Sequence, residues 1–303
     1  EFRRVLFRSM SINTWEQGTV SLPKSLTSGI VSIVKTPILW AVVALFAVSL
    51  VVAPGSVSQS AVDAMLPFAG IMALAAVGQT LVIMLKGIDL SVPGLVTVGA
   101  VVVTQFTKES GSLIWAIVVT LLIAAVVGAI NGLVIAYFSV SPLVVTLAMN
   151  SILMGSVLAY TGGTPVPADP ALSDFAIGKT FSISNIVLTV LIIVAIISIL
   201  ISRTVWGRRL ISVGSNDVAA RAAGVRYNQI QISGYVIAAL LYAAGGILLA
   251  GLLKSPNTLV GGPYLMPVIA AVVLGGTSLL GGRGRIWGTV LGALFLSQLS
   301  QLV

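Results

Sequence analysis

Residues 203–229, RTVWGRRLISVGSNDVAARAAGVRYNQ, form the one long polar segment in a chain that is otherwise rich in apolar residues. The only acid in this segment is Asp217, whereas the arginines number five: Arg203, Arg208, Arg209, Arg221 and Arg226. Loops rich in Lys and Arg stay on the cytoplasmic side of a membrane. The segment is therefore predicted to be a cytoplasmic loop between two membrane spans.

This loop contains the signature of a short helix. Ser215, Asn216 and Asp217 offer an N-cap, residues 218–223 are rich in Ala, and Gly224 suits the C′ position. A small, smooth helix on the cytoplasmic face is typical of an element that docks into a groove on a partner. The alternative is an ordinary Arg-rich loop that only obeys the orientation rule.

The composition excludes a soluble globular protein. Hydrophobic residues make up 57% of the chain and charged residues 8%, with a mean hydropathy of +1.12, whereas soluble domains carry about 25% charged residues. The chain has no Cys and no His, which excludes disulfide frameworks and Cys- or His-ligated metal sites. The net charge of +8 needs no nucleic-acid partner, because basic residues cluster at the ends of spans.

The apolar segments predict an all-α polytopic bundle. A spanning helix needs about 20 mostly apolar residues, and the alternating segments of about 10 residues that build membrane barrels are absent. The predicted spans number nine, and a tenth is expected in the complete protein. They lie near 37–53, 64–85, 90–107, 113–138, 142–160, 183–202, 230–253, 264–281 and 286–303.

Basic residues set the orientation of these spans. With a cytoplasmic N-terminus, the basic residues outside are Lys108, Lys179 and Lys254, and residues 161–182 become an external loop. Those inside are the five loop arginines together with Lys24, Lys35, Lys86, Arg283 and Arg285. This excess of inside charge agrees with the positive-inside rule.

The two ends of the chain carry expectations of their own. Residues 1–9, EFRRVLFRS, precede Met10 and look like a translated sequencing adapter, so they are left out of the fold argument. Residues 10–36 are expected to be a cytoplasmic tail, followed by a transmembrane domain over 37–303. The chain stops at Val303 inside an apolar run, so a C-terminal truncation is expected.

A second informative stretch is 275–292, GGTSLLGGRGRIWGTVLG, which is dense in glycine. Glycine destabilises helix interiors, so this density indicates a role for the backbone. Glycines at 275, 276, 281, 282 and 284 predict a helix that breaks and forms again at the cytoplasmic side. Gly288 and Gly292 have the spacing that lets helices pack closely, and close packing alone is the alternative for that pair.

Four motifs, in order, resemble those of the ribose, xylose and galactose type of ABC transporter permeases. KGIDLSVPG at 86–94 is similar to a GGIDLSVG motif, and SPLVVTL at 141–147 to the start of a helix in that family. GRRLISVGSNDVAARAAGV at 207–225 resembles the loop that contacts the ATPase, and IAAVVLGGTSLLGGRGRIWGT at 269–289 the C-terminal signature. Residues 264–271, YLMPVIAA, lack the acidic pair that many relatives carry there.

This resemblance implies a permease subunit of an ATP-driven importer for a monosaccharide or similar small solute, in the bacterial inner membrane. The chain has no phosphate-binding GxxxxGK[ST] motif, so no enzyme activity and no cofactor is expected. The implied partners are separate ATPase subunits, an extracytoplasmic sugar-binding protein and a second permease copy or paralogue. Residues 203–229 would be the ATPase-docking loop, with coupling residues Gly214, Asn216, Asp217, Ala219, Ala220, Arg221 and Gly224.

Other polar residues have two interpretations each. Asp89, between two apolar spans, either caps the following helix beside Ser91 or has a gating role. The same gating or structural role is expected of Gly275, Gly276, Gly281, Gly282, Arg283 and Gly284. Uncharged polar groups within spans either line a path for a neutral sugar or form hydrogen bonds between helices. These groups are Gln79, Asn131, Thr146 and Asn150.

Other functions remain open at this point. A permease for branched-chain amino acids or nucleosides is the nearest alternative, because related glycine-rich signatures occur there. A stand-alone secondary transporter would be favoured by buried carboxylates or inverted repeats, and only Asp63 and Asp89 lie near apolar spans. A membrane enzyme is disfavoured by the lack of His and Cys and by the few acids.

Overall fold

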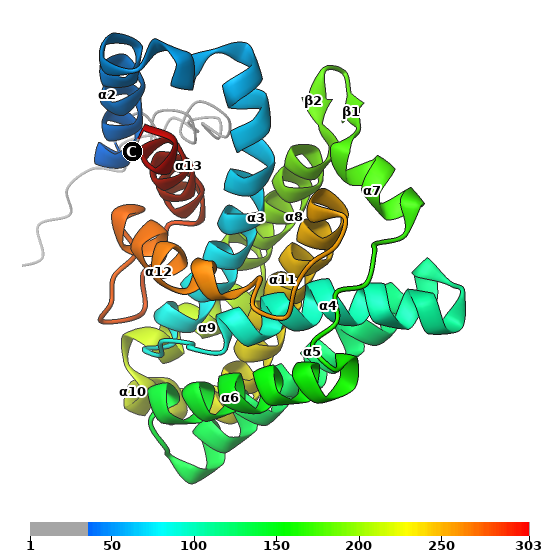
Figure 1. The fold of residues 1–303 in the computed structure, drawn as a ribbon. Coiled ribbons are helices and arrows are strands. Elements are labelled where there is room, and N and C mark those ends of the chain that lie inside the picture. The colour runs from blue at the N-terminus through cyan, green and yellow to red at the C-terminus, as the bar shows by residue number, and fades with distance from the viewer. Residues whose placement is uncertain (1–35, 303) are drawn as a thin grey trace, which may run out of the picture. The chain divides into compact units, whose positions relative to one another are not determined.

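The computed structural model describes residues 36–302, which belong to one compact helical unit (Figure 1). The adapter-like residues 1–9 and residues 10–35 of the expected tail lie outside the described residues. The helices are α2 (Pro37–Val52), α3 (Gln59–Met84), α4 (Val92–Ser110), α5 (Leu113–Phe138), α6 (Pro142–Thr161), α7 (Pro170–Ile177), α8 (Asn185–Arg203), α9 (Val205–Ser215), α10 (Asp217–Ala222), α11 (Tyr227–Leu253), α12 (Leu265–Leu274) and α13 (Ile286–Leu302). Two 3₁₀ turns, η1 (Pro54–Val57) and η2 (Gly262–Tyr264), and two short strands, β1 (Lys179–Thr180) and β2 (Ile183–Ser184), complete the unit.

The all-α prediction is confirmed, but nine complete spans are not established. Within the described residues, α3, α5, α6, α8 and α11 are long and apolar enough to cross a membrane, whereas α2, the stretch 262–274 and α13 are shorter. The predicted span over 264–281 is wrong as a continuous helix, because α12 ends at Leu274. Ten residues reach about 15 Å, half of the hydrocarbon thickness of a bilayer.

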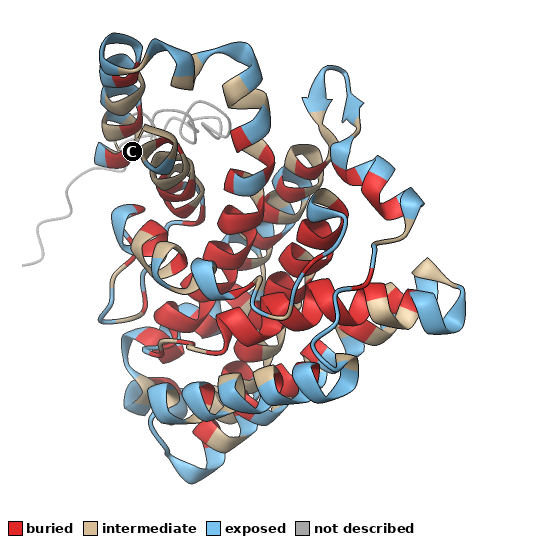
Figure 2. Ribbon diagram, viewed as in Figure 1, coloured by how far each residue is buried: buried red, intermediate tan, exposed pale blue. Residues whose placement is uncertain are grey.

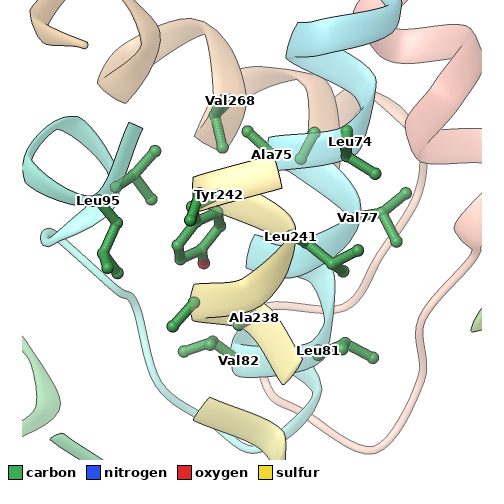
Figure 3. Packing of buried hydrophobic residues seen from close by; sticks show 14 of the residues in the cluster. Leu74, Ala75, Val77, Leu81, Val82, Leu95, Ala238, Leu241, Tyr242 and Val268 are labelled. Atoms are coloured by element: carbon green, nitrogen blue, oxygen red, sulfur yellow. The ribbon is translucent and has the colours of Figure 1, made fainter. Parts of the chain in front are cut away.

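Helices α3 and α11 form the centre of the unit. Most of both helices is buried, and Figure 2 shows the buried residues gathered along them. Figure 3 shows side chains of α3, α4, α11 and α12 in this core, among them Leu74, Leu95, Tyr242 and Val268. Helix α11 packs against α3, α4, α5 and α7, and α3 packs against α8, α11, α12 and α13, so several elements bury each central helix.

Small residues bring α5 onto α11. A Cβ atom on Gly128 would lie 2.7 Å from the backbone oxygen of Tyr235, and one on Gly132 would lie 2.6 Å from Ile232 Cα. Glycine therefore allows a backbone approach that any side chain would block. The outer faces of α5, α6 and α8 expose apolar side chains such as Leu122, Ile152 and Ile192, which suits contact with lipid.

The external loop predicted at 161–182 contains no span but is partly ordered into elements. It includes α7, whose first turn is capped by the carboxylate of Asp169, and it leads into the hairpin of β1 and β2. Lys179 in this hairpin binds Asp63 at the start of α3, with 2.7 Å between Nζ and Oδ2. Lys86 follows the other end of α3, about 39 Å away along a 26-residue helix. The residues expected inside and outside therefore occupy opposite ends of this helix.

Candidate functional site

Residues 203–229, predicted to be the ATPase-docking loop and called the docking loop below, contain two consecutive short helices, α9 and α10. Asn216 caps α10, because its side-chain oxygen accepts a hydrogen bond from the Ala219 amide at 3.0 Å. Gly224 follows the helix with a φ of +79°, which is the left-handed conformation expected of a C′ residue. The short helix predicted over 218–223 is thus present, one residue earlier. Val218 is 72% exposed on it, so α10 presents an apolar surface outside the bundle.

Two polar contacts connect α10 to the central helices. Lys86 Nζ, just beyond α3, lies 3.4 Å from Asp217 Oδ1. The guanidinium of Arg221 lies 3.9 Å from the ring centroid of Tyr227, the first residue of α11. Exposed pairs of these kinds contribute roughly 0–1 kcal/mol each. Helix α10 is therefore held next to the ends of α3 and α11 by weak contacts.

A cavity of about 350 Å³ lies between this helix and the bundle. Its lining includes Lys86, Asp217 and Arg221, together with Tyr227 and the buried side chain of Gln231. The coupling residues predicted from the sequence did not include Lys86 and Tyr227, which line this cavity. A lone Lys after a long apolar span and an aromatic residue six positions after Arg221 are the signals that could have suggested them.

Backbone contacts join three distant segments at Gly214, near the end of α9. A Cβ atom on Gly214 would clash with the backbone oxygen of Met84 and would lie 2.8 Å from the Gly282 amide nitrogen. That amide donates a hydrogen bond to the same Met84 oxygen at 2.9 Å. We refer to these three residues, Met84, Gly214 and Gly282, as the backbone junction. The junction connects α3, the docking loop and the glycine-rich segment without any intervening side chain.

The glycine-rich segment breaks the chain between α12 and α13, as predicted. Residues 278–283 form a turn that is closed by a hydrogen bond from the Ser278 amide to the backbone oxygen of Arg283, at 3.0 Å. The side chain of Arg283 is exposed. The backbone φ angles of Gly276, Gly281 and Gly282 are +81°, +84° and +73°. Residues other than glycine rarely adopt such positive values.

The remaining glycines of the segment allow close contacts. Gly284 lies against the Met84 side chain, and Gly275 against Gly288 at the start of α13. One turn later, Gly292 faces the backbone of Ala271. The prediction that the glycines at 288 and 292 bring two helices close together is confirmed.

Asp89 lies in the break between α3 and α4, outside the spanning helices, and is 1% exposed. Its carboxylate accepts hydrogen bonds from the Ser91 amide at 2.8 Å and the Ser91 hydroxyl at 2.5 Å. Burial raises the pKa of this carboxyl to about 6, and the bonds from Ser91 oppose the rise. Ser91 occupies the N-cap position of α4, so Asp89 contacts the residue before the helix rather than its first-turn amides.

The four uncharged polar residues expected in a solute path all contact residues 88–94. Thr146 and Asn150 on α6 accept hydrogen bonds from the Leu90 and Gly94 amides, each at 2.8 Å. On α5, the amide group of Asn131 donates to the Ser91 hydroxyl at 3.3 Å.

Gln79 on α3 holds the backbone of Asp89. In the amide orientation that satisfies every neighbouring group, its oxygen accepts from Asp89 N at 3.1 Å, and its nitrogen donates to Asp89 O at 3.3 Å and to Tyr242 Oη at 2.9 Å. These bonds supply partners for backbone groups that the helix break leaves unpaired. The four residues thus make the cross-helix contacts named above as the alternative, and pathway lining by them stays a prediction.

Within residues 36–302, no three His, Cys, Asp or Glu side chains gather into a set of possible metal ligands.

Comparison with known proteins gives consistent results over most of the chain. The family model described as branched-chain amino acid transport system / permease component matches residues 61–303. A ribose import permease protein of Escherichia coli is 37% identical over 234 residues, which cover 75% of this chain and 73% of that protein. No solved structure matches the chain.

Two further relatives import other solutes. A fructose import permease protein of Rhizobium meliloti is 32% identical over 274 residues, covering 87% of this chain and 76% of its own length. An autoinducer 2 import system permease protein of Escherichia coli is 35% identical over 236 residues, which cover 78% of this chain and 69% of that protein.

Proposed function

Because the chain belongs to the family of ABC importer permeases of the ribose, xylose and galactose type, we propose that it translocates a monosaccharide or similar small polar solute. The proposed location is the bacterial inner membrane. The names of the relatives favour a sugar over the branched-chain amino acids named in the family description, or nucleosides. ATP hydrolysis is assigned to separate partner subunits, and an extracytoplasmic binding protein is assigned the delivery of solute.

The proposed mechanism is alternating access driven through the docking loop. The exposed face of α10 docks on the ATPase, and movement of the ATPase displaces α10. The backbone junction carries this proposal, because it connects the docking loop directly to α3 and to the break between α12 and α13. A displacement of α9 at Gly214 would then shift both segments, and the permease would open to the other side. A second permease copy or a paralogue would complete the translocation unit.

Reconstitution tests this function. The complete permease is co-purified with its ATPase, placed in proteoliposomes, and assayed for ATP hydrolysis with binding protein loaded with ribose or fructose. Stimulation by one sugar, together with ATP-dependent uptake of that sugar, is the expected result. Solute flux that follows an ion gradient without any ATPase would instead identify a secondary transporter.

Substitutions in α10 test the docking role. Arg221→Glu removes the cation over Tyr227 and reverses the charge of the surface, and Gly224→Val forces a β-branched residue into the left-handed region. We expect each change to lower ATP-dependent uptake by at least about tenfold, the effect of 1.4 kcal/mol on an equilibrium constant. The bundle itself should keep its thermal stability in detergent.

Conservative changes at the same two positions serve as controls. Arg221→Lys keeps the cation, and Gly224→Asn places a residue that tolerates a positive φ, so both should retain most of the uptake. Normal uptake in Arg221→Glu and Gly224→Val would contradict the proposal that α10 docks on the ATPase.

A further inference from the structure

A second and larger cavity lies at the other end of α3 from the backbone junction. Its volume is about 720 Å³, within the range of sites that bind small molecules. The walls come from the first half of α3, the end of α11, residues 257–267 and the second half of α13. Under the orientation derived above, this end of the bundle faces the outside, where solute arrives.

The polar lining of this cavity is uncharged. The described lining residues include no Asp, Glu, Lys or Arg, and the polar ones are Asn257, Tyr264, Ser297, Ser300 and Gln301. The rest of the surface is apolar and includes Met65, Phe68 and Leu249. Hydroxyl and amide groups match the hydroxyl groups of a neutral solute, which donate and accept hydrogen bonds at once. Apolar and aromatic walls suit its C–H faces.

The polar groups at this cavity also have unused hydrogen-bonding capacity. Gln301 donates through Nε2 to the Ala61 oxygen at 3.0 Å, while its buried Oε1 has no partner among residues 36–302. Asn257 uses its Oδ1 to accept from the Leu259 amide at 2.9 Å, which leaves its NH₂ group available. The hydroxyls of Tyr264, Ser297 and Ser300 make no hydrogen bond within the described part of the chain.

Most of the interior polar side chains predicted to line a solute path are bound to a neighbouring segment instead. Gln79, Thr146 and Asn150 form hydrogen bonds to the backbone of residues 88–94, and Asn131 donates to Ser91 while its Oδ1 has no partner among residues 36–302. On α13, Gln298 donates to the Ser49 hydroxyl at 3.1 Å, while its Oε1 has no partner among residues 36–302. Uncommitted polar groups are unfavourable against lipid, so the polar residues that share this cavity favour a polar occupant over an acyl chain.

We propose that this cavity, lined by Asn257, Tyr264, Ser297, Ser300 and Gln301, binds the transported solute on the outward side, as a neutral polyhydroxylated molecule of monosaccharide size. The proposal rests on the proposed function, since it names the site at which the imported solute first contacts the permease.

Cysteine labelling tests the site, because the chain has no natural Cys. Ser297→Cys and Ser300→Cys are expressed with the ATPase and binding protein, and a membrane-impermeant maleimide is added outside. Ribose and fructose are the probes. We expect labelling of both positions, slowed by the sugar that the wild type transports. Ser110→Cys is the matched control, because this exposed serine ends α4 away from the cavity; it should be labelled at the same rate with and without sugar.

Transport kinetics give a second measurement. Tyr264→Phe and Ser300→Ala each remove one hydroxyl, and we expect the KM for uptake to rise by about two- to tenfold, the effect of one lost hydrogen bond. Ser110→Ala is the control here, because Ser110 lies outside the cavity lining, and it should keep the wild-type KM and the wild-type rate of basal ATP hydrolysis.

The outcomes separate the two proposals. If the wild type transports a sugar but labelling is unprotected and the KM values are unchanged, the cavity is not the solute site. If the reagent reaches Ser110→Cys but neither cavity position, a lipid chain or a second copy fills the cavity, and the proposal is again overturned. If the wild type shows no ATP-dependent uptake of either probe while remaining folded with its ATPase, the proposed function fails, and the role of the cavity fails with it.

Discussion

At the scale of single residues, polar side chains of α3 and α6 support the backbone of residues 88–94. Gln79 is fully buried and forms hydrogen bonds to both backbone groups of Asp89 and to Tyr242. Thr146 and Asn150 do the same for the Leu90 and Gly94 amides. A break between two helices leaves such groups without intrahelical partners, and these side chains replace them. These side chains therefore hold the backbone of the break between α3 and α4 in one conformation.

A substitution at Gln79 tests this role. Gln79→Leu keeps a similar volume but leaves three buried polar groups without partners, so we expect the free energy of unfolding in detergent to fall by about 1–2 kcal/mol. Gln59→Leu is the control, since Gln59 is exposed at the start of the same helix and bonds only Asp63. Equal stability of the two variants would show that the amide does not hold the break.

At the scale of elements, α10 is too short to be stable by itself. It has six residues, whereas isolated helices need about 12–15 residues even with favourable sequences. Its stability must come from the Asn216 cap, the Ala220 side chain buried against the bundle, and the contacts of Asp217 and Arg221. The helical form of α10 therefore depends on its cap and on its contacts with the bundle.

Removing the cap tests the importance of helix order for docking. Asn216→Ala takes away the acceptor for the Ala219 amide and should cost about 1 kcal/mol of local helix stability. We expect less ATPase to co-purify with this variant, while the melting temperature of the bundle stays the same. Asn216→Asp and Asn216→Ser keep a capping oxygen and should restore co-purification; failure of both to do so would argue against capping as the cause.

At the scale of the whole molecule, segments about 70 and 130 residues apart in sequence meet at the backbone junction. Gly214 allows this contact only because it has no side chain. Gly214→Ala would push a methyl group against the Met84 oxygen, and overpacking of this kind typically costs about 1–3 kcal/mol. We expect a lower melting temperature and a loss of uptake.

The matched control for this change is Gly155→Ala on α6. No atom lies within 4 Å of the position that its Cβ would take, so the substitution should be neutral or slightly stabilising. Wild-type uptake in Gly214→Ala would show that the junction does not transmit movement between the docking loop and α3.

Local sequence features predicted much of the architecture. Apolar runs located the long helices to within a few residues, and Asn216 and Gly224 marked the ends of α10. The prediction failed over 264–281, because the mean hydropathy of this stretch is high and does not reveal that the helix ends at Leu274. The glycines that follow were recognised as a break, but hydropathy alone could not show that the helix ends before them.

The polar residues of the bundle show where sequence reasoning reaches its limit. An amide within an apolar span has the same sequence signature whether it faces a cavity or a neighbouring backbone. Gln79 contacts Asp89, ten positions later, and Asn150 contacts Gly94, 56 positions earlier. The cavity residues Tyr264 and Ser300 come from separate elements and share no local pattern.

The sequence by itself determined the membrane class, the family and the short helix α10, because these depend on composition, motifs and interactions within one or two turns. Only the tertiary structure decided which polar groups are committed and which are free, and which segments meet at Gly214. The physical reason is that hydrogen-bond satisfaction and close backbone contact depend on residues far apart in the chain.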